Sequence, residues 1–196
     1  MATRRVPLHH GSTVRRAGRW YRLAEPDWSD PLDSGYSQAG GGRWNAPGAF
    51  PVLYLNDTAA TARLQVLHKL AGLPYAPEDL NPDEQHDLVS VDVPDNAYLD
   101  CISDSGLTLL GLPASYPRHA NGRPVSHATC RPVGQQAWDD GLPGIACRSV
   151  AGGATRTNEE LAFFDRAHQP HPTATARAPF ADWWWDTRTE DRSANA

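Results

Sequence analysis

The amino-acid sequence predicts one mixed α/β (α+β) domain with a sheet core and flanking helices. Its 196 residues are a usual length for one domain, long enough to bury roughly 70% of the unfolded surface. Short apolar segments typical of strands occur in both halves of the chain. Two segments in which apolar residues have helical spacing, 58–71 and 128–138, lie between these strands.

In the first half of the chain, a strand at 18–24 is followed by a long loop rich in Pro, Asp and Gly, and then by a second strand at 51–55. Asp57 or Thr58 is a natural N-cap for the helix that follows, and Gly72 with Pro74 ends it. Thr61 and Gln65 lie on one flank of its apolar stripe, which consists of Ala59, Ala62, Val66, Leu67 and Leu70.

The second half predicts more strands than helices. Residues 88–93 alternate in polarity like a half-buried strand, and a further strand is expected at 97–102. The segment 103–127 is ambiguous, with one helical turn at 107–112, and the helix 128–138 ends before Asp139-Asp140-Gly141. Two more strands are expected at 144–150 and 160–164.

The two ends of the chain are expected to be irregular. Residues 1–12 form a flexible lead-in, the domain spans 13–166, and 167–196 is a Pro- and Trp-bearing C-terminal segment whose end, 188–196, is disordered. An aromatic triplet beside prolines, Trp183-Trp184-Trp185, more often docks onto its own domain than onto a partner. We therefore expect docking.

Composition excludes several classes of function. The formal charge of −5 argues against a broad phosphate-backbone footprint, so neither direct nucleic-acid binding nor an RNA-acting enzyme is expected. No apolar run approaches 18 residues and no secretory signal is visible, which predicts a cytoplasmic protein without a membrane contact. The cysteines Cys101, Cys130 and Cys147 form no CxxC pair and are expected to be reduced, buried and not metal ligands.

The stretch Gly40 to Asn45 is the most informative part of the sequence. Three glycines allow backbone N–H groups to approach a ligand closely, and Arg43 offers a planar fork that matches phosphate or carboxylate oxygens. Trp44 is suited to stacking and Asn45 to hydrogen bonding. The plainer interpretation, a tight turn whose Trp anchors the core, has comparable weight for a glycine-rich turn taken alone.

Taken in order, these segments resemble the RES domain family, named for its Arg, Glu and Ser positions. The resemblance covers residues 17–165 and rests on Trp20-Tyr21-Arg22, the Gly41-Gly42-Arg43-Trp44-Asn45 loop, the Leu53-Tyr54-Leu55 strand with its Ala-rich helix, and the late strand with Ser149. It implies an ADP-ribosyltransferase-like fold with a mixed, split sheet. It also implies a toxin of a toxin–antitoxin system that consumes NAD as its substrate and needs no other cofactor.

The resemblance assigns site residues and a partner. Catalytic positions fall on Arg22, Gln65 and Ser149; substrate-binding positions fall on Tyr21, Arg43, Trp44, Asn45 and Tyr54. Two arginines are suited to hold pyrophosphate, a tyrosine to stack on nicotinamide or shape its pocket, and a serine to hydrogen-bond ribose or amide. No metal is expected. The implied partner is an antitoxin with an Xre-like helix-turn-helix, and a homodimer is left open.

Gln65 departs from the family, whose helix carries glutamate at this position. Cleavage of the nicotinamide–ribose bond develops positive charge, and a carboxylate at ~4 Å stabilises it by about 4 kcal/mol, roughly a thousandfold in rate. Three explanations stay open: an engineered inactivation, a natural loss that leaves an NAD-binding or antitoxin-binding homologue, or another acid, with Glu159 and Glu160 the nearest candidates. The acceptor of ADP-ribose also stays open between water, phosphate and a protein side chain.

Overall fold

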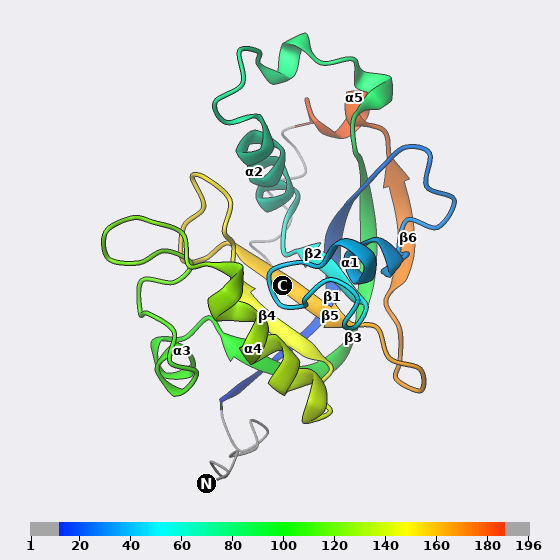
Figure 1. The fold of residues 1–196 in the computed structure, drawn as a ribbon. Coiled ribbons are helices and arrows are strands. Elements are labelled where there is room, and N and C mark those ends of the chain that lie inside the picture. Colours follow the sequence, from blue (N-terminus) through cyan, green and yellow to red (C-terminus); the bar gives the residue numbers. More distant parts are fainter. Residues whose placement is uncertain (1–11, 187–196) are drawn as a thin grey trace, which may run out of the picture.

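A computed structural model describes residues 12–186 of the chain. Figure 1 shows one sheet whose faces are covered by helices and long loops. The strands are β1 (Thr13–Ala24), β2 (Val52–Asn56), β3 (Asp87–Cys101), β4 (Gly144–Arg148), β5 (Glu159–Phe164) and β6 (Thr173–Ala178). The helices are α1 (Gly35–Gly40), α2 (Ala59–Leu70), α3 (Asp104–Leu109), α4 (His127–Asp139) and α5 (Phe180–Trp183), with short 3₁₀ turns at Pro77–Asp79 and Pro82–Glu84.

The sheet is mixed and nearly closed. Its strand order is β1-β2-β5-β4-β3-β6, and an additional β1–β3 pairing joins the first five strands in sequence into a ring. The β3–β4 pair is parallel and the other pairs are antiparallel. One residue pair, Tyr21 with Asn56, connects β1 to β2, so the sheet splits there. The mixed, split sheet with flanking helices expected from the sequence is confirmed.

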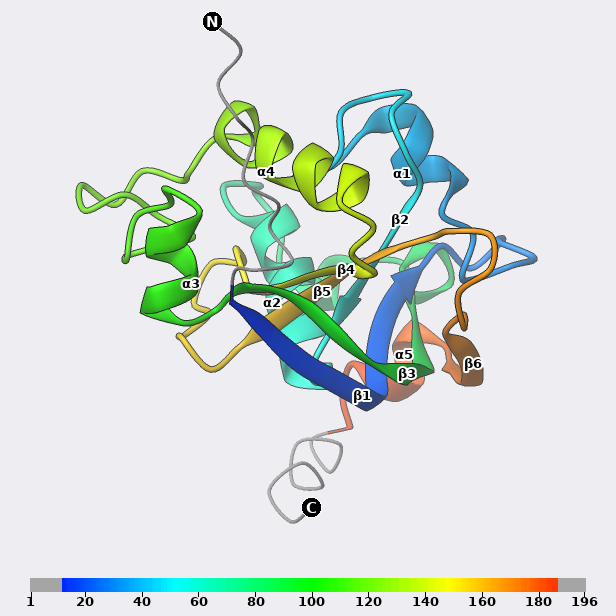
Figure 2. The same cartoon turned by 90° about the horizontal axis from the view of Figure 1, so that it is seen from below.

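Three hydrophobic clusters hold the strands and helices together. One fills the inside of the ring and includes Trp20, Leu53, Val91, Tyr98 and Phe163. A second cluster lies outside the ring, between the strands and α4. A third lies where α2 and α5 cover the sheet. Figure 2 shows α4 and α5 on opposite sides of the sheet. All three cysteines are buried free thiols, as expected. None of the helices in residues 12–186 is both long and apolar enough to cross a membrane.

Two of the expected strands form one long strand. The segments 88–93 and 97–102 join as β3, because its pairing with β1 continues across Pro94. The register shifts between Arg16 and Gly18 on β1, and this bulge lies opposite the proline that cannot donate a ladder hydrogen bond. Gly18 has φ +77°, which favours glycine at the bulge.

Helix α2 follows its sequence prediction closely. Thr58 caps it by accepting from the backbone N–H of Thr61 at 3.0 Å. Of the predicted stripe, Ala59, Ala62 and Val66 are buried and Leu70 is partly buried, whereas Leu67 is 43% exposed. The prediction for Leu67 was therefore wrong, because the stripe that α2 buries is narrower than five positions. Thr61 and Gln65 face β5 and the segment before it: Asn158 Nδ2 donates to Thr61 Oγ1 at 2.9 Å.

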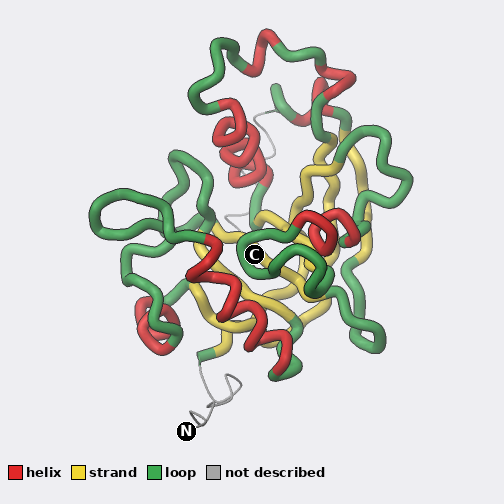
Figure 3. Tube along the Cα trace, viewed as in Figure 1, coloured by secondary structure: helices red, strands yellow, loops and turns green. Residues whose placement is uncertain are grey.

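The chain after residue 166 adds to the domain. Strand β6 pairs with the first half of β3, and Phe180 and Trp183 of α5 pack in the third cluster with Leu88 of β3. Figure 3 shows the helices, in red, arranged around the strands, in yellow. Trp183 is 2% exposed and its indole N–H donates to the His86 carbonyl at 3.0 Å, whereas Trp185 is 56% exposed. Docking of the triplet is confirmed for Trp183. Of the lead-in expected to be flexible, residues 1–12, all but Ser12 lie outside the described part of the chain, as do residues 188–196, which are expected to be disordered.

Candidate active site

The loop from Gly41 to Asn45 is closed by hydrogen bonds to Tyr54 on β2. The Tyr54 hydroxyl donates to Asn45 Oδ1 at 2.9 Å and accepts from the Trp44 N–H at 3.1 Å. Asn45 is fully buried, and its Nδ2 donates to the carbonyls of Ser37 and Phe50. Burial raises the pKa of Tyr54, so its hydroxyl stays protonated as a donor. Asn45 and Tyr54 therefore hold the loop closed.

Helix α4 supports the same loop from outside the sheet. Arg131 Nε donates to the Gly42 carbonyl at 3.1 Å, and Arg43 Nη1 donates to the Val125 carbonyl at 2.9 Å. A Cβ atom at position 42 would clash with the Tyr54 hydroxyl, so glycine is required there for close approach. One end of the Arg43 fork is therefore held by the protein, with the side chain half-buried.

Trp44 lies in the core and not in an open ligand site. It is 1% exposed and its ring centroid lies 6.0 Å from that of Tyr116. The expectation that Trp44 stacks on a ligand is corrected accordingly: the indole anchors the loop, because a side chain of this size between sheet and helix is stabilised by burial. Of the two interpretations open for this stretch, the structure favours the anchored turn for Trp44 and Asn45.

Gln65, Ser149 and Glu160 meet at one point between α2, β4 and β5. Gln65 Nε2 donates to Glu160 Oε1 at 2.5 Å and to Ser149 Oγ at 3.5 Å. Glu160 Oε1 also accepts from the Val150 N–H at 2.9 Å, and the Ser149 hydroxyl is hydrogen-bonded to the Glu160 carboxyl. Ser149 is 2% exposed. The structure thus brings together two positions assigned from the sequence and adds a carboxyl group to them.

Glu159 and Glu160 point to opposite faces of β5. Glu159 forms a two-pronged ion pair with Arg16 of β1, at 2.7 and 2.8 Å, on the inner side of the ring. Neighbouring residues in a strand alternate between faces, so this contact directs Glu160 outward to α2. Of the two acids left open by the sequence, Glu160 is the one beside Gln65.

Arg22 and Tyr21 also lie on opposite faces of their strand. Arg22 is 7% exposed; its Nη2 donates to the Asp33 carbonyl at 2.8 Å and its guanidinium lies over the Trp28 ring. Burial lowers its pKa to about 10, opposed by the charges of Asp33 and Asp30. The structure does not bring Arg22 together with Gln65. Tyr21 faces outward and lines a pocket of about 460 Å³ with Arg19, Ser90 and Arg177.

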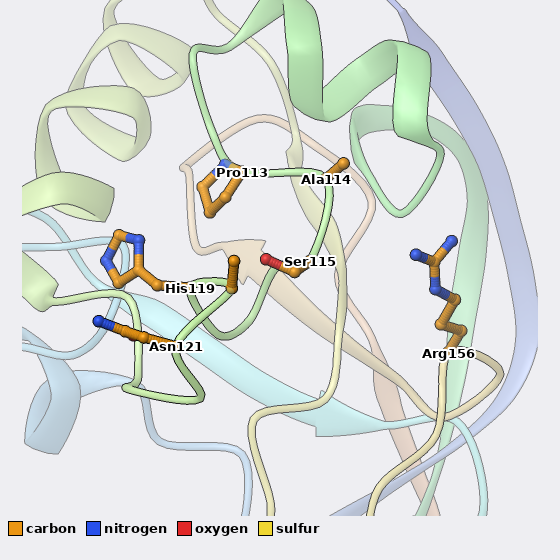
Figure 4. Close-up of a pocket in the computed structure, with 7 residues that line it drawn as sticks. Pro113, Ala114, Ser115, His119, Asn121 and Arg156 are labelled. Atoms are coloured by element: carbon orange, nitrogen blue, oxygen red, sulfur yellow. The ribbon is translucent and has the colours of Figure 1, made fainter.

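A glycine-bearing loop, residues 151–158, connects Ser149 to Glu160. In Figure 1 it runs beside α2, and the Gly152 N–H donates to His68 Nδ1 at 3.3 Å. Its outer end borders an open hollow of about 810 Å³. Figure 4 shows Arg156 on one side of this hollow and Ser115, His119 and Asn121 on the other. Within residues 12–186, no group of three or more His, Cys, Asp or Glu is arranged to hold a metal.

The Glu160 carboxyl is electrostatically unusual. Burial raises its pKa, and the hydrogen bonds from Ser149 and Val150 and the charge of Arg43 only partly oppose this. An acid whose pKa is raised by folding binds more protons in the native state, so stability falls as pH rises from the ordinary value of 4.5 through the raised pKa.

We expect Glu160→Gln to remove this pH dependence. At pH 4 the Tm of the variant and that of the unmodified protein should differ least. As pH rises to the raised pKa, the Tm of the variant should increasingly exceed that of the unmodified protein, by about 2–4 °C for each kcal/mol of destabilisation removed. Thermal unfolding followed by circular dichroism from pH 4 to 8 measures it. Glu159→Gln, which breaks an ion pair instead, serves as the control; a pH-independent difference for Glu160→Gln would contradict the account.

Two residues differ in role from what the sequence predicts. Glu160 contacts Gln65 and Ser149, and Arg22 lies away from them. The signal for Glu160 was strand parity: with Ala162 and Phe164 on the outer face, Glu160 had to share it. The same parity shows that Tyr21 and Arg22, as neighbours in β1, do not face one site.

Comparisons with known proteins agree with this fold. The RES domain matches residues 19–186. Among solved structures, the chain is similar to a chain of the crystal structure of the M. tuberculosis MbcT–MbcA toxin–antitoxin complex, with a TM-score of 0.69, 21% identity and coverage of 88% of this chain and 89% of that one. At that identity the likeness shows the fold. No curated protein matches. With most of its length matched, the chain belongs to the RES domain family.

Proposed function

We propose that this chain is a toxin of a toxin–antitoxin system that binds NAD and cleaves its nicotinamide–ribose bond. The observation that carries the proposal is the cluster of Gln65, Ser149 and Glu160, in which an amide, a hydroxyl and a carboxyl converge. Membership of the RES family, whose members the sequence resemblance identifies as NAD-consuming toxins, supports it.

Each group in the cluster has a task in such a reaction. The Ser149 hydroxyl and the Gln65 amide are suited to hydrogen-bond a ribose hydroxyl or the nicotinamide carboxamide. Arg43, whose charge acts on Glu160, is the cation available for pyrophosphate. Arg22, buried against Asp33 and Trp28, holds the segment after β1 in place and does not contact the substrate. Tyr54 shapes the site by holding the loop.

We further propose an antitoxin with an Xre-like helix-turn-helix as the partner, with action in the cytoplasm. The similar solved structure is itself a toxin–antitoxin complex, which supports the first part. Blocking access to the Gln65–Ser149–Glu160 cluster is the simplest way for such a partner to neutralise the toxin. Self-association of this chain is compatible with the proposal and is measured by light scattering during purification.

The direct test is nicotinamide release from NAD, followed by liquid chromatography. We expect release by the unmodified protein and at least about a tenfold loss in Ser149→Ala, because one hydrogen bond to a substrate group is removed. Ser105→Ala, an exposed serine on α3, is the matched control and should keep full activity.

The products decide between the candidate acceptors. Free ADP-ribose indicates water, ADP-ribose 1″-phosphate indicates phosphate, and label retained on protein indicates an ADP-ribosyltransferase. Saturable NAD binding in calorimetry without nicotinamide release would show a binding-only homologue and would contradict the proposed cleavage.

A further inference from the structure

We infer that Glu160 is the carboxylate that stabilises the positive charge formed on ribose during cleavage, and that Gln65 is the residue that positions it. The inference rests on the proposed function and names the group that performs its central electrostatic task. It assigns the chemistry to β5 in place of α2.

The reaction requires such a group near the ribose. The electron pair of the C1″–N bond leaves with the nicotinamide ring, which becomes neutral, and positive charge moves to C1″ and the ring oxygen of the nicotinamide-side ribose. When water is the acceptor, it adds to C1″ and releases a proton to solvent, so NAD⁺ and water give nicotinamide, ADP-ribose and H⁺. A fixed carboxylate beside the ribose is stabilising chiefly in the transition state, where that charge develops.

Glu160 is positioned by hydrogen-bond donors that converge on one of its carboxyl oxygens. Oε1 accepts from Gln65 Nε2 and from the Val150 N–H, and the adjacent Ser149 hydroxyl is also bonded to the carboxyl. None of the ion pairs within residues 12–186 includes Glu160. A partly buried carboxyl group, hydrogen-bonded but not ion-paired, is well prepared to receive a cation.

The other acids around the cluster are engaged elsewhere. Glu159 is paired with Arg16 on the opposite face of β5, and Asp104 is paired with Arg148 and Arg156. Asp57 precedes α2 and is hydrogen-bonded to Thr58 and Thr61 at the start of that helix. Among the described residues, Glu160 is therefore the carboxyl in contact with both Gln65 and Ser149.

The neutral amide at position 65 is matched to a charge at position 160. Its N–H group donates to the carboxylate, which favours the ionised form. A carboxylate at position 65 would place two like charges within hydrogen-bond distance, and they would share one proton. Gln65 and Glu160 thus form a consistent pair in which β5 supplies the charge.

The first test is turnover and binding in Glu160→Gln, an isosteric change. We expect nicotinamide release to fall at least about 100-fold, while the Kd for NAD changes less than about threefold, because the lost interaction belongs to the transition state. Glu159→Gln removes a neighbouring charge on the opposite face and should release nicotinamide at the unmodified rate. Full activity of Glu160→Gln beside an active unmodified protein would overturn the inference and leave the proposed function standing.

The second test does not depend on turnover. An ADP-linked pyrrolidine analogue of ribose carries its ammonium where the transition state is positive. We expect the unmodified protein to bind this cation at least about tenfold more tightly than neutral ADP-ribose, with the preference lost in Glu160→Gln and kept in Glu159→Gln. A preference that depends on Glu160 in a protein that releases no nicotinamide would support the charge site and reject the cleavage. No preference in the unmodified protein would overturn the inference.

The positioning role of Gln65 has its own readout. In Gln65→Glu the two carboxyl groups share a proton, so the acidic limb of the pH–rate profile should move upward by at least about one pH unit. For a non-releasing protein, the pH dependence of pyrrolidine binding gives the same readout. An unchanged profile would contradict the role assigned to Gln65.

Discussion

Gly134→Ala is expected to destabilise the domain strongly. An added Cβ at this position of α4 would clash with the Trp44 carbonyl oxygen and lie 2.7 Å from its carbonyl carbon. Both are backbone atoms of a loop fastened by Asn45 and Tyr54, so neither side relaxes cheaply. Overpacking against fixed backbone should cost at least about 3 kcal/mol, a large part of the stability of an ordinary domain.

Urea unfolding followed by tryptophan fluorescence measures the loss. Gly40→Ala is the matched control, since a Cβ there meets no atom within 4 Å and the residue lies in α1. The control should unfold within about 1 kcal/mol of the unmodified protein. Equal midpoints for the two variants would show that α4 and the loop are not packed as closely as described.

Trp183→Ala is the second large effect and concerns the C-terminal segment. Truncating a tryptophan that is 2% exposed and hydrogen-bonded to the His86 carbonyl leaves a cavity under α5 and an unpaired carbonyl. The expected cost is about 3–5 kcal/mol, seen as a lower urea midpoint. Loss of the Trp183 side chain would also loosen the packing of Phe180 and Trp184, whose stacked rings have centroids 5.1 Å apart.

Trp185→Ala provides the comparison for the same triplet. Because Trp185 is 56% exposed, its truncation should change stability by less than about 1 kcal/mol. A small effect at position 183, or equal effects at both positions, would contradict the docked arrangement of α5.

Periodicity predicted the elements that carry a clear apolar pattern. Helices α2 and α4 and the strands β2, β4 and β5 lie within a few residues of their predicted bounds, because each buries a defined face. Strand β6 gave no such signal: its residues, 173–178, are mostly exposed, and pairing with β3 makes it a strand. Helix α1 was not predicted, because its sequence has the composition of a loop and none of its residues is buried.

The candidate site was only partly predictable, for a related reason. Family order pointed to Gln65 and Ser149, which the structure brings together. Which face a strand residue occupies depends on its neighbours in the sheet, so the inward place of Arg22 and the outward place of Glu160 emerged only with the register. Similarly, the motif alone does not show that the Trp44 side chain is buried in the core.

A crystal structure of the Glu160→Gln variant with NAD would locate the substrate directly. We expect the nicotinamide-side ribose in contact with the side chain at position 160 and with the Ser149 hydroxyl. NAD bound on another face, such as the pocket lined by Tyr21 and Arg177, or no NAD in crystals grown at saturating concentration, would contradict this expectation.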